Sequence, residues 1–322
     1  MKVLVTGGAG FIGSNIVDAL VARGDKVVVL DNLVTGKIAN IEHNRDKIEY
    51  IYGDIRDLDK VREAVRGVEV VCHQAALGSV PRSIADPLAT NEVNITGTLN
   101  VLIAAKDAGV RRVTYASSSS IYGDTPELPK HEGIRPNPRS PYALTKLAAE
   151  EYLRIFYQVY GLETIALRYF NVFGPRQDPD GPYAAVIPLF ITSALENKSP
   201  TIHGDGTQSR DFTYVANVVH ANLLAFDASS KAAGRAYNIA LGGQMTLLEL
   251  FNGIKRLTGA TVDPIFEPPR AGDVKHSCAA IDLAVEWLKF SPVVSFEKGL
   301  AMTVESYSVA EPGDRVMSGV VR

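Results

Sequence analysis

The sequence predicts an α/β protein with a doubly wound parallel sheet and a smaller C-terminal lobe. Short runs rich in valine and isoleucine alternate with segments of helical periodicity along the first half of the chain, as in repeated βαβ units. A glycine-rich turn separates the first such run from the first helical segment, which is typical of this kind of sheet. The 322 residues exceed the size at which one hydrophobic core usually stops growing, so two lobes are expected.

The elements of the sheet are expected in chain order, each from its own pattern. Two longer apolar runs with period-two or buried character predict strands over 68–73 and 110–116, and helical spacing predicts a helix over 94–108 between them. Loops that contain glycine and proline separate shorter elements beyond residue 173, which predicts the smaller lobe. The first elements, in the order strand, helix, strand and strand, are expected at residues 3–6, 12–23, 26–30 and 48–52.

The composition describes an ordinary globular protein and excludes several function classes. With 46% hydrophobic residues, 21% charged residues and a net charge of −3, the chain lacks the basic excess of nucleic-acid-binding proteins. No apolar run approaches the roughly 20 residues that span a bilayer, and the first predicted strand starts too early for a signal peptide. We therefore expect a cytoplasmic protein with no nucleic-acid or membrane partner.

The cysteines and histidines predict no metal site. Cys72 and Cys278 stand far apart in no paired metal spacing, which fits a reducing compartment, and the six histidines form no ligand pattern.

A glycine-rich loop carries the strongest single motif. Gly7, Gly10 and Gly13 follow the first predicted strand directly and open the first predicted helix. Glycine there permits a tight turn, close backbone approach to a pyrophosphate and close helix packing, and the helix N-terminus favours the negative charge. The loop therefore predicts dinucleotide binding on a Rossmann-type sheet, with a merely structural glycine turn as the alternative.

Two acidic residues end the next strands. Asp31 can accept hydrogen bonds from ribose hydroxyls and would repel an added phosphate, so NAD is favoured over NADP. The alternative for Asp31 is a surface turn. Asp54 could hold the adenine edge, or could simply form a turn after its strand.

A long helix is predicted from Pro141 to about Tyr160, with Ser140 as its N-cap and Gly161 as its stop. Tyr142 and Lys146 lie four residues apart and share one face near its start. The ammonium, the positive helix end and an oxidised nicotinamide would lower the pKa of the phenol, which makes Tyr142 a candidate general base. The alternative is a solvated lysine beside a packed tyrosine.

The motifs TGGAGFIG, SSSSIYG, the Tyr142 and Lys146 pair, and RYFNVFGPRQ together resemble the extended short-chain dehydrogenase/reductase family, and within it the UDP-hexose 4-epimerases. The resemblance runs from Met1 to about Leu300. It implies an NAD-binding Rossmann domain over 1–170 and a UDP-sugar lobe over 171–322, some segments of which return to the first domain. It also implies 4-epimerisation through a 4-keto intermediate, with Tyr142 taking the proton of the 4-hydroxyl as hydride passes to NAD.

The resemblance assigns roles to the serine run and to the cofactor site. Ser118 would bridge Tyr142 and the substrate hydroxyl, Ser117 would face the nicotinamide, Ser119 could contact the sugar, and Ser120 could be only a turn residue. Lys146 would bind the nicotinamide ribose, and Tyr169 would lie on the nicotinamide side. The expected cofactor-binding residues are Gly7, Gly10, Phe11, Ile12, Gly13, Asp31, Asn32, Gly36, Asp54, Ile55, Gln74, Ala75, Ala76, Asn94, Ser117, Tyr142, Lys146 and Tyr169.

The substrate site is implied in the same way. Arg210 and Arg270 are the candidates for the UDP pyrophosphate, although Arg210 could instead pair with Asp211 or Asp205. Asn217 stands where the family often has aspartate. The expected substrate-binding residues are Ser79, Ser118, Ser119, Tyr142, Asn171, Arg210, Arg270, Asp273 and Ser277.

One position bears on the sugar. Ser277 aligns with a bulky aromatic in epimerases restricted to plain hexoses, and a small residue leaves room for a 2-acetamido group, unless Ser277 is merely exposed. The resemblance therefore favours UDP-GlcNAc and UDP-GalNAc as substrates, with UDP-glucose and UDP-galactose as further ones.

The neighbouring reactions leave two alternatives. Sugar-nucleotide dehydratases carry an Asp-Glu pair where this chain has Ser119 and Ser120, which cannot eliminate water. A UDP-uronic acid 4-epimerase and a non-catalytic NAD-binding sensor or scaffold remain open as alternative functions.

A homodimer is expected through the helices after Asn94 and Ser140, whose apolar faces could otherwise pack internally.

Overall fold

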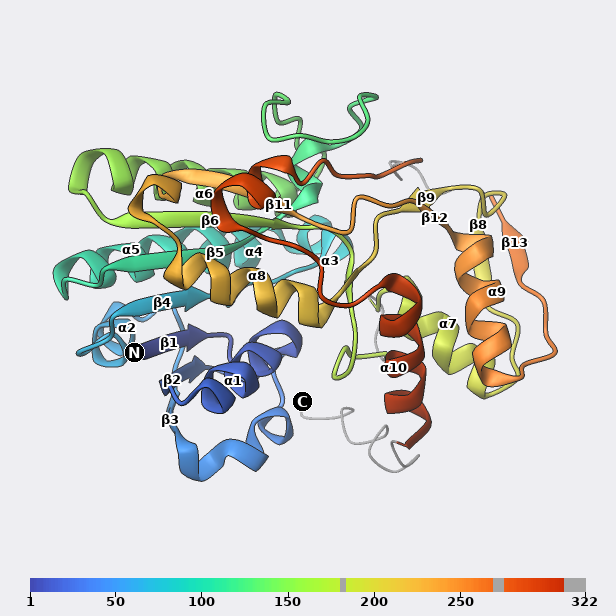
Figure 1. The fold of residues 1–322 in the computed structure, drawn as a ribbon, viewed down its shortest axis with the longest axis horizontal. Coiled ribbons are helices and arrows are strands. Elements are labelled where there is room, and N and C mark those ends of the chain that lie inside the picture. Colours follow the sequence, from blue (N-terminus) through green and yellow to red (C-terminus); the bar gives the residue numbers. More distant parts are fainter. Residues whose placement is uncertain (180–183, 269–274, 310–322) are drawn as a thin grey trace.

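A computed structural model describes residues 1–179, 184–268 and 275–309 of the chain. Seven parallel strands form its central sheet, in the spatial order β11-β6-β5-β4-β1-β2-β3 (Figure 1). The predicted fold class, a doubly wound parallel sheet with a smaller lobe, is confirmed. The strands are β1 (Lys2–Thr6), β2 (Lys26–Asp31), β3 (Ile48–Tyr52), β4 (Val70–His73), β5 (Arg112–Ser118), β6 (Glu163–Tyr169) and β11 (Arg235–Ile239).

Helices cover both faces of this sheet because its strands are apolar on both sides. In β1, Val5 packs with Ile16 and Phe226 on one face, whereas Leu4 packs with Leu102 and other side chains on the opposite face. The first face carries α1 (Phe11–Arg23) and α8 (Val215–Asp227), and the second carries α2 (Leu58–Ala64), α5 (Gly97–Asp107) and α6 (Pro141–Tyr160).

Most predicted elements are observed with shifts of one or two residues. The predicted helix over 94–108 is instead a succession of α4 (Pro87–Asn91), the π-helical turn η3 (Glu92–Thr96) and α5. The predicted strand over 110–116 runs on to Ser118, because Ser117 and Ser118 pair with Arg168 and Tyr169 of β6. The sequence is no longer apolar at Ser117 and Ser118, although the backbone of β5 still pairs with β6 at these residues.

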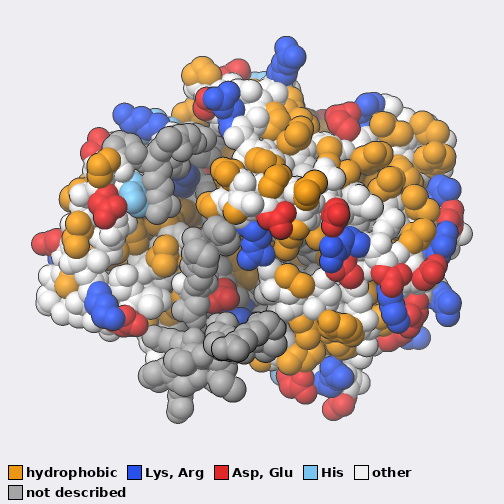
Figure 2. All heavy atoms as spheres, turned by 180° about the vertical axis from the view of Figure 1, so that it is seen from behind, with side chains coloured by type: hydrophobic (Ala, Val, Ile, Leu, Met, Phe, Trp, Pro, Cys, Tyr) orange, Lys and Arg blue, Asp and Glu red, His pale blue; other side chains and the backbone are white. Residues whose placement is uncertain are grey.

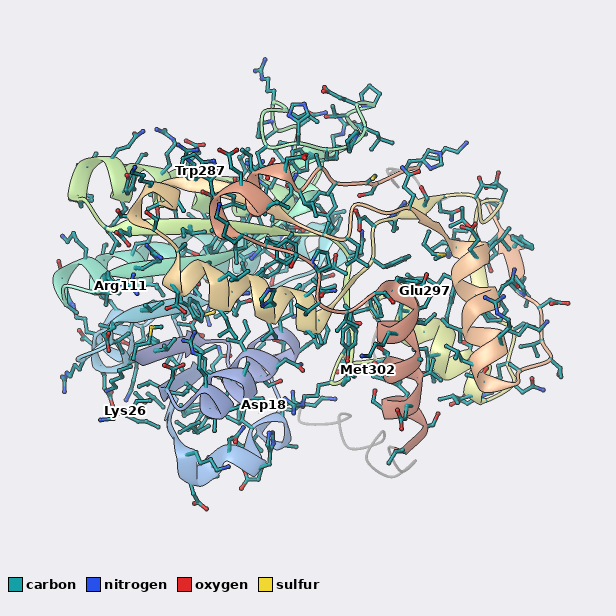
Figure 3. All side chains as sticks on the ribbon, viewed as in Figure 1. Asp18, Lys26, Arg111, Trp287, Glu297 and Met302 are labelled. Carbon is teal, nitrogen blue, oxygen red and sulfur yellow. The ribbon has the colours of Figure 1, made fainter. Side chains whose placement is uncertain are left out.

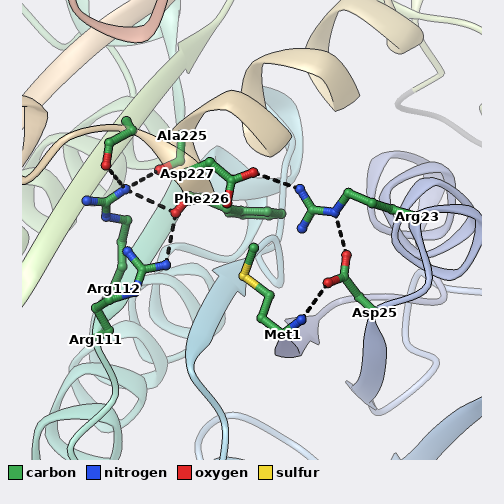
Figure 4. A network of polar contacts seen from close by, with 9 residues as sticks. Met1, Arg23, Asp25, Arg111, Arg112, Ala225, Phe226 and Asp227 are labelled. Atoms are coloured by element: carbon green, nitrogen blue, oxygen red, sulfur yellow. Dashed lines mark hydrogen bonds and ion pairs between the residues drawn. The ribbon is translucent and has the colours of Figure 1, made fainter.

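Two segments from the second half of the chain return to the central sheet: β11 pairs with β6 as its edge strand, and α8 packs on one of its faces. The C-terminal end of α8 is fixed by Arg112, whose side chain is 1% exposed. Its Nη1 donates to the carbonyl oxygens of Ala225 at 2.8 Å, Phe226 at 3.1 Å and Ala228 at 2.7 Å (Figure 4). These are carbonyls that a helix end leaves without an intrahelical partner. The domain division at residue 170 stays a prediction.

The smaller lobe has its own core, in which Phe173, Phe190, Phe251 and Tyr214 pack together. Asp18 of α1 lies at the side of the first domain that faces this lobe (Figure 3), and it accepts a hydrogen bond of 2.6 Å from Arg176 Nη2. The lobe consists of α7 (Val186–Leu195), α9 (Leu247–Thr258), α10 (Phe296–Val309) and the strand pairs β7 (Val172–Phe173) with β10 (Thr213–Tyr214), β8 (Thr201–His203) with β13 (Ile265–Glu267), and β9 (Ser209–Arg210) with β12 (Met245–Thr246).

The remaining described elements are short. No helix in the described ranges is both long and apolar enough for a bilayer. The short elements are η1 (Ile38–Asn40), η2 (Glu42–Lys47), α3 (Val80–Ala85), η4 (Ser119–Tyr122), η5 (Ser230–Ala232) and η6 (Ala284–Leu288).

Candidate active site

The glycine-rich loop needs glycine at two of the three predicted positions, Gly7 and Gly13. Gly7 has φ +68°, and a Cβ on it would stand 2.7 Å from the backbone nitrogen of Ala75, so any other residue is strained and crowded. A Cβ on Gly13 would stand 2.1 Å from the Gly7 carbonyl oxygen, which explains the close packing of α1 on the loop. Gly10 is the N-cap of α1 and supplies no capping side chain, so the first amides of the helix remain available to an anion.

Asp31 lies beside this loop at the end of β2. Its carboxylate is 7% exposed and accepts hydrogen bonds from the backbone nitrogens of Ala9 at 2.9 Å and Leu33 at 2.8 Å. Burial raises its pKa despite these bonds. A Cβ on Gly36 would lie 3.0 Å from both carboxylate oxygens, so glycine at this position lets the backbone pass close to the Asp31 side chain. The loop, the helix N-terminus with Phe11 and Ile12 in its first turn, and Asp31 fit a bound NAD.

Asp54 behaves as the alternative reading predicted. Its carboxylate accepts hydrogen bonds from the Arg56 backbone nitrogen at 2.8 Å, from the Arg56 guanidinium at 2.9 and 3.0 Å, and from Asn32 Nδ2 at 2.8 Å. Hydrogen bonding to Arg56 holds its pKa below the usual value. Ile55 is buried and packs where a Cβ on Gly97 would clash. Asp54 therefore organises a turn, and an adenine contact by its carboxylate stays a prediction.

Gln74 and Tyr169 meet at the carboxyl ends of β4 and β6. Gln74 Nε2 donates to the Tyr169 hydroxyl at 3.2 Å, and Asn222 Nδ2 of α8 donates to the same oxygen at 2.8 Å. Burial raises the pKa of Tyr169. Asn222 was not predicted from the sequence, because nothing marks an asparagine inside an apolar helix as a partner of a residue 53 positions earlier. Ala75 and Ala76 continue the loop from Gln74 beside Gly7.

Asn94 holds the loop after β4 rather than presenting its side chain outward. It is 1% exposed, accepts a hydrogen bond from the Leu77 backbone nitrogen at 2.8 Å, and donates to the Leu77 carbonyl at 3.2 Å and to Thr145 Oγ1 at 3.0 Å. Both polar atoms of the amide are used within the protein, and the expected cofactor contact of Asn94 stays a prediction.

A cavity of about 830 Å³ collects most of the predicted catalytic and substrate residues. It lies between the end of β5, the start of α6 and the second lobe. Its walls include residues that were not predicted to belong to the site, Ser120, Tyr122, Lys130, Arg139 and Ser140. The predicted site residues that line it are Ile12, Ser117, Ser118, Ser119, Tyr142, Tyr169, Asn171, Arg210 and Ser277.

Two members of the predicted catalytic trio line this cavity: Ser118, the last residue of β5, and Tyr142 in the first turn of α6. Ser118 lies close enough to Tyr142 to lower the pKa of its phenol, and the third member, Lys146, is buried. Lys146 follows one turn later, with its Nζ 5.8 Å from the centre of the Tyr142 ring. The same Nζ donates to the Ala116 carbonyl oxygen at 2.7 Å, and it lies 4.8 Å from the centre of the Tyr115 ring. Helix α6 has the predicted bounds and caps, since Ser140 Oγ accepts from Ala143 and Gly161 ends it in the left-handed region.

The electrostatics of the protein alone differ from the expectation. Burial raises the pKa of Tyr142 above its usual value, although the Ser118 hydrogen bond lowers it. Burial also lowers the pKa of Lys146 to about 7, while the charge of Glu150 raises it. In the protein without cofactor, burial therefore outweighs the hydrogen bond of Ser118, and the predicted lowering of the tyrosine pKa, which included an oxidised nicotinamide, stays a prediction.

The four side chains of the serine run at residues 117–120 have different partners. Ser117 was expected to face the nicotinamide, but its hydroxyl donates to Glu150 Oε1 on α6, because alternate residues of a strand point to opposite faces. Ser118 Oγ also accepts from the backbone nitrogen of Ser120 at 3.2 Å. Ser119 begins η4 on the cavity wall. Ser120 is more than a turn residue, since its buried hydroxyl lines the cavity without a partner in the described protein.

The predicted substrate residues are placed unequally. Arg210 lines the cavity and donates from Nη1 to the Ser209 carbonyl at 3.0 Å and to the Lys275 carbonyl at 3.3 Å. Asn171 lines it as well and donates to the Asp211 carbonyl at 3.1 Å. Ser79 Oγ is instead the N-cap of α3, at 3.2 Å from the Arg82 nitrogen, so its expected substrate contact stays a prediction. Arg270 and Asp273 lie outside the described residues.

Asp211 and Asn217 are buried, and each fixes neighbouring backbone segments through hydrogen bonds. The Asp211 carboxylate accepts hydrogen bonds, each of 3.1 Å, from the backbone nitrogens of Leu241, Gly242 and Ala279, and burial raises its pKa to about 6. It therefore ties together the segments that carry Arg210 and Ser277. Asn217, the departure from the family pattern, is fully buried and bonds residues 293–294 through both polar atoms.

No metal-binding cluster stands beside these groups. Among the described residues, no three His, Cys, Asp or Glu side chains come together as metal ligands would.

Comparisons with known proteins give one consistent result. The family described as NAD dependent epimerase/dehydratase family matches residues 3–240. The putative UDP-glucose 4-epimerase of Methanocaldococcus jannaschii is 41% identical over 94% of this chain and 97% of that protein. The solved UDP-N-acetylglucosamine 4-epimerase of Methanobrevibacter ruminantium, in complex with UDP-N-acetylmuramic acid, has a TM-score of 0.91 and 43% identity, covering 95% of this chain and 98% of that one. The UDP-glucose 4-epimerase of Thermus thermophilus, in complex with NAD, has a TM-score of 0.87 and 39% identity, covering 97% and 100%.

Proposed function

Since the chain belongs to the NAD dependent epimerase/dehydratase family, we propose that this NAD-dependent UDP-sugar 4-epimerase interconverts UDP-GlcNAc and UDP-GalNAc, and accepts UDP-glucose and UDP-galactose as further substrates. The predicted resemblance to extended short-chain dehydrogenases and 4-epimerases is confirmed. The single observation that supports the N-acetylated substrates is the small side chain of Ser277 in the wall of the cavity that holds Tyr142 and Ser118.

The roles of the catalytic residues follow from their positions. NAD, when bound, supplies the chemistry that takes hydride from carbon 4 of the sugar and returns it. Tyr142 takes the proton of the 4-hydroxyl and later gives it back, and Ser118 holds that hydroxyl through the bond it shares with Tyr142. Lys146, fixed by the Ala116 carbonyl, places a cation near the phenolate. The ring nearest to Lys146 on the sheet side is Tyr115, which excludes water from this part of the site.

The substrate is proposed to lie along the cavity. Arg210 at the second lobe would bind the pyrophosphate, which leaves the sugar at the serines and Tyr142. Holding the nucleotide at its phosphates lets the sugar turn over between the two hydride transfers. Ser277 then borders the space that an acetamido group sweeps, and its backbone nitrogen is fixed at 3.0 Å from the Ser209 carbonyl.

A sugar that bears an acid group is a second candidate substrate, and Lys130 favours it. The side chain of Lys130 is buried, lines the same cavity, and donates from Nζ to the Thr125 carbonyl. An ammonium has three hydrogens to donate, so a carboxylate of the substrate could take another. The related Methanobrevibacter structure holds the acidic sugar nucleotide UDP-N-acetylmuramic acid.

A homodimer is proposed as the assembly. Large apolar side chains are exposed on α3, α4 and α6, among them Leu88 at 76%, Ile84 at 65% and Leu144 at 55%. Figure 2 shows hydrophobic side chains gathered on the half of the molecule that carries α6. Helix α5 packs against α2 and α6 within the chain, and its predicted contribution to a dimer stays a prediction. Light scattering tests this: a mass near 34.7 kDa in solution would contradict a dimer.

A substrate panel tests the proposed function. The purified protein, without added NAD, should convert UDP-GalNAc to UDP-GlcNAc, and UDP-galactose to UDP-glucose more slowly. Tyr142→Phe should lose at least about a hundredfold in rate, because a positioned general base contributes on that order, and should keep its fold and NAD. A preference for UDP-galacturonate would favour the acidic substrates instead. Wild-type rates in Tyr142→Phe would remove Tyr142 as the base, and inactivity on every UDP-sugar would refute the function.

A further inference from the structure

A third ionisable residue stands in line with the catalytic pair on α6. Tyr142, Lys146 and Glu150 are spaced four residues apart, so they form one stripe along the face of α6 that packs on the sheet. Glu150 is 7% exposed, although glutamate is almost never fully buried unless it is paired. The reaction as described above makes no use of it.

The Glu150 carboxylate joins the two strands under the active site. Ser117 of β5 donates its hydroxyl to Oε1, and Arg168 of β6 donates from Nε to Oε1 at 3.0 Å and from Nη2 to Oε2 at 2.8 Å. Ser117 and Arg168 are register partners across the two strands. The carboxylate therefore fixes the position of Ser117, and Ser117 is covalently next to the catalytic Ser118.

The same network reaches the wall of the catalytic cavity by a second route. Arg168 Nη1 donates to the Tyr122 hydroxyl at 2.8 Å, and that hydroxyl donates to Asn238 Oδ1 at 2.7 Å. Tyr122 and Ser117 both line the catalytic cavity. Glu150 and Arg168 line a separate cavity of about 350 Å³ on the other side. The Glu150–Arg168 ion pair therefore lies between two cavities, and salt in the solvent screens its attraction less than that of a pair on the surface.

Stability alone is a weak explanation for such a pair. Desolvating two charges costs much of what their attraction returns, and apolar replacements of buried pairs are often neutral or stabilising. A more specific consequence concerns Lys146. Its Nζ is bonded to the carbonyl of Ala116, burial pushes it towards the neutral amine, and the Glu150 carboxylate is the charge that raises its pKa against burial.

The other ionisable groups around this stripe do not share that effect. Burial lowers the pKa of His73 to about 3 and raises those of Tyr115 and Tyr122, the latter to about 12, so all three are neutral near pH 7. The remaining carboxyl, Glu132, acts on Arg168 and has its pKa raised by burial. The charges that face Lys146 from α6 and β6 are therefore those of Glu150 and Arg168.

We infer that Glu150 is a positioning residue of this active site: it fixes the end of β5 through Ser117, and its carboxylate, one helical turn from Lys146, favours the charged form of that lysine beside Tyr142. The positive charge of Arg168 partly compensates the Glu150 carboxylate and so limits the effect of that carboxylate on the charge of Lys146. The consequence for catalysis rests on the proposed function, whereas the charge of Lys146 does not depend on it.

Two substitutions of opposite sign test the inference. Glu150→Gln removes the attraction and leaves Arg168 unbalanced, so Lys146 should lose its proton about one pH unit lower, the usual effect of one charge at this separation. Arg168→Gln leaves the carboxylate unbalanced, so the midpoint should rise. The titration is followed by the Cε chemical shift of Lys146 in protein labelled with carbon-13 lysine, assigned with Lys146→Met. In the active holoenzyme, the alkaline limb of kcat should move with the midpoint.

Two control variants separate charge from structure. Glu151→Gln removes the neighbouring glutamate, which pairs with Arg154 at 2.8 Å on the surface, and should leave the midpoint unchanged. Glu150→Asp keeps the charge and should stay near the wild type. Midpoints that do not move in folded Glu150→Gln or Arg168→Gln, or that move in the same direction in both, would overturn the inference. If one variant does not fold, the sign of the other decides. Absence of epimerase activity in the wild-type protein, with the expected midpoints in the variants, would refute the proposed function alone.

Discussion

Replacing Ser277 by tyrosine should change which sugars the enzyme turns over. The side chain borders the catalytic cavity, and the backbone nitrogen of Ser277 is bonded to the Ser209 carbonyl at 3.0 Å. The backbone therefore keeps its place in the substitution, and the added phenol ring must enter the space that we assign to the acetamido group. Plain hexoses need less of this space.

The size of the effect follows from packing. Forcing extra atoms into a filled site costs about 1–3 kcal/mol. Taking about 2 kcal/mol, and a factor of ten for each 1.4 kcal/mol, kcat/KM for UDP-GlcNAc should fall about thirtyfold relative to UDP-glucose. Ser277→Ala should leave the ratio close to that of the wild type, because it adds no volume.

The assay measures kcat/KM for both substrates in each variant, and the comparison uses their ratio. A general loss of folded protein or of cofactor lowers both values equally, so it leaves the ratio unchanged. A variant that remains active on UDP-glucose with an unchanged ratio would refute the assignment of Ser277 to the acetamido space.

Two further predictions concern buried polar groups. Asn217→Asp introduces the residue that the family often has at this position. It should nevertheless lower the free energy of unfolding by about 3 kcal/mol in denaturant titrations, because the new carboxylate would be buried against the Val294 carbonyl, which accepts a hydrogen bond of 2.8 Å from Asn217 Nδ2 in the wild type. A gain in stability would contradict this prediction. His73 has its pKa lowered to about 3 by burial, so only the unfolded chain binds that proton between pH 6.5 and 3. The unfolding free energy should therefore fall by about 2 kcal/mol from pH 7 to pH 5 through this group, and His73→Gln should remove that share of the pH dependence, whereas an unchanged slope would mean that His73 is not responsible.

Local signals allowed the sequence to predict the parts of the site that depend on a few neighbouring residues. The bounds of α6 follow from Ser140, Pro141 and Gly161, which act on the backbone next to them. The contact of Gly13 with the Gly7 carbonyl is equally local, whereas the close approach of Ala75 to Gly7 depends on the pairing of β1 with β4.

Other parts depended on contacts that the sequence does not encode locally. The direction of Ser117 was mispredicted because the strand was expected to end at residue 116, and the pairing of Ser117 with Arg168 is visible only once β5 and β6 are neighbours. Lys130 carries no motif, and it reaches the cavity because its backbone pairs with the segment around Ala279. The joining of β11 to β6 likewise arises from long-range pairing.

The charge state of the catalytic pair follows from competition between burial and the neighbouring charges. Burial favours the neutral phenol of Tyr142 and the neutral amine of Lys146, and each of these preferences opposes the charged pair that proton abstraction requires. The Glu150 carboxylate favours the charged form of the lysine. In the part of the chain that the structure describes, no cation other than Lys146 has a comparable effect on the Tyr142 phenol. The missing stabilisation of the phenolate has to come with the oxidised cofactor, whose positive charge would lie in the same cavity. An enzyme arranged in this way has a reactive tyrosine only when NAD is bound, so the pH at which Tyr142 ionises should rise when the cofactor is removed.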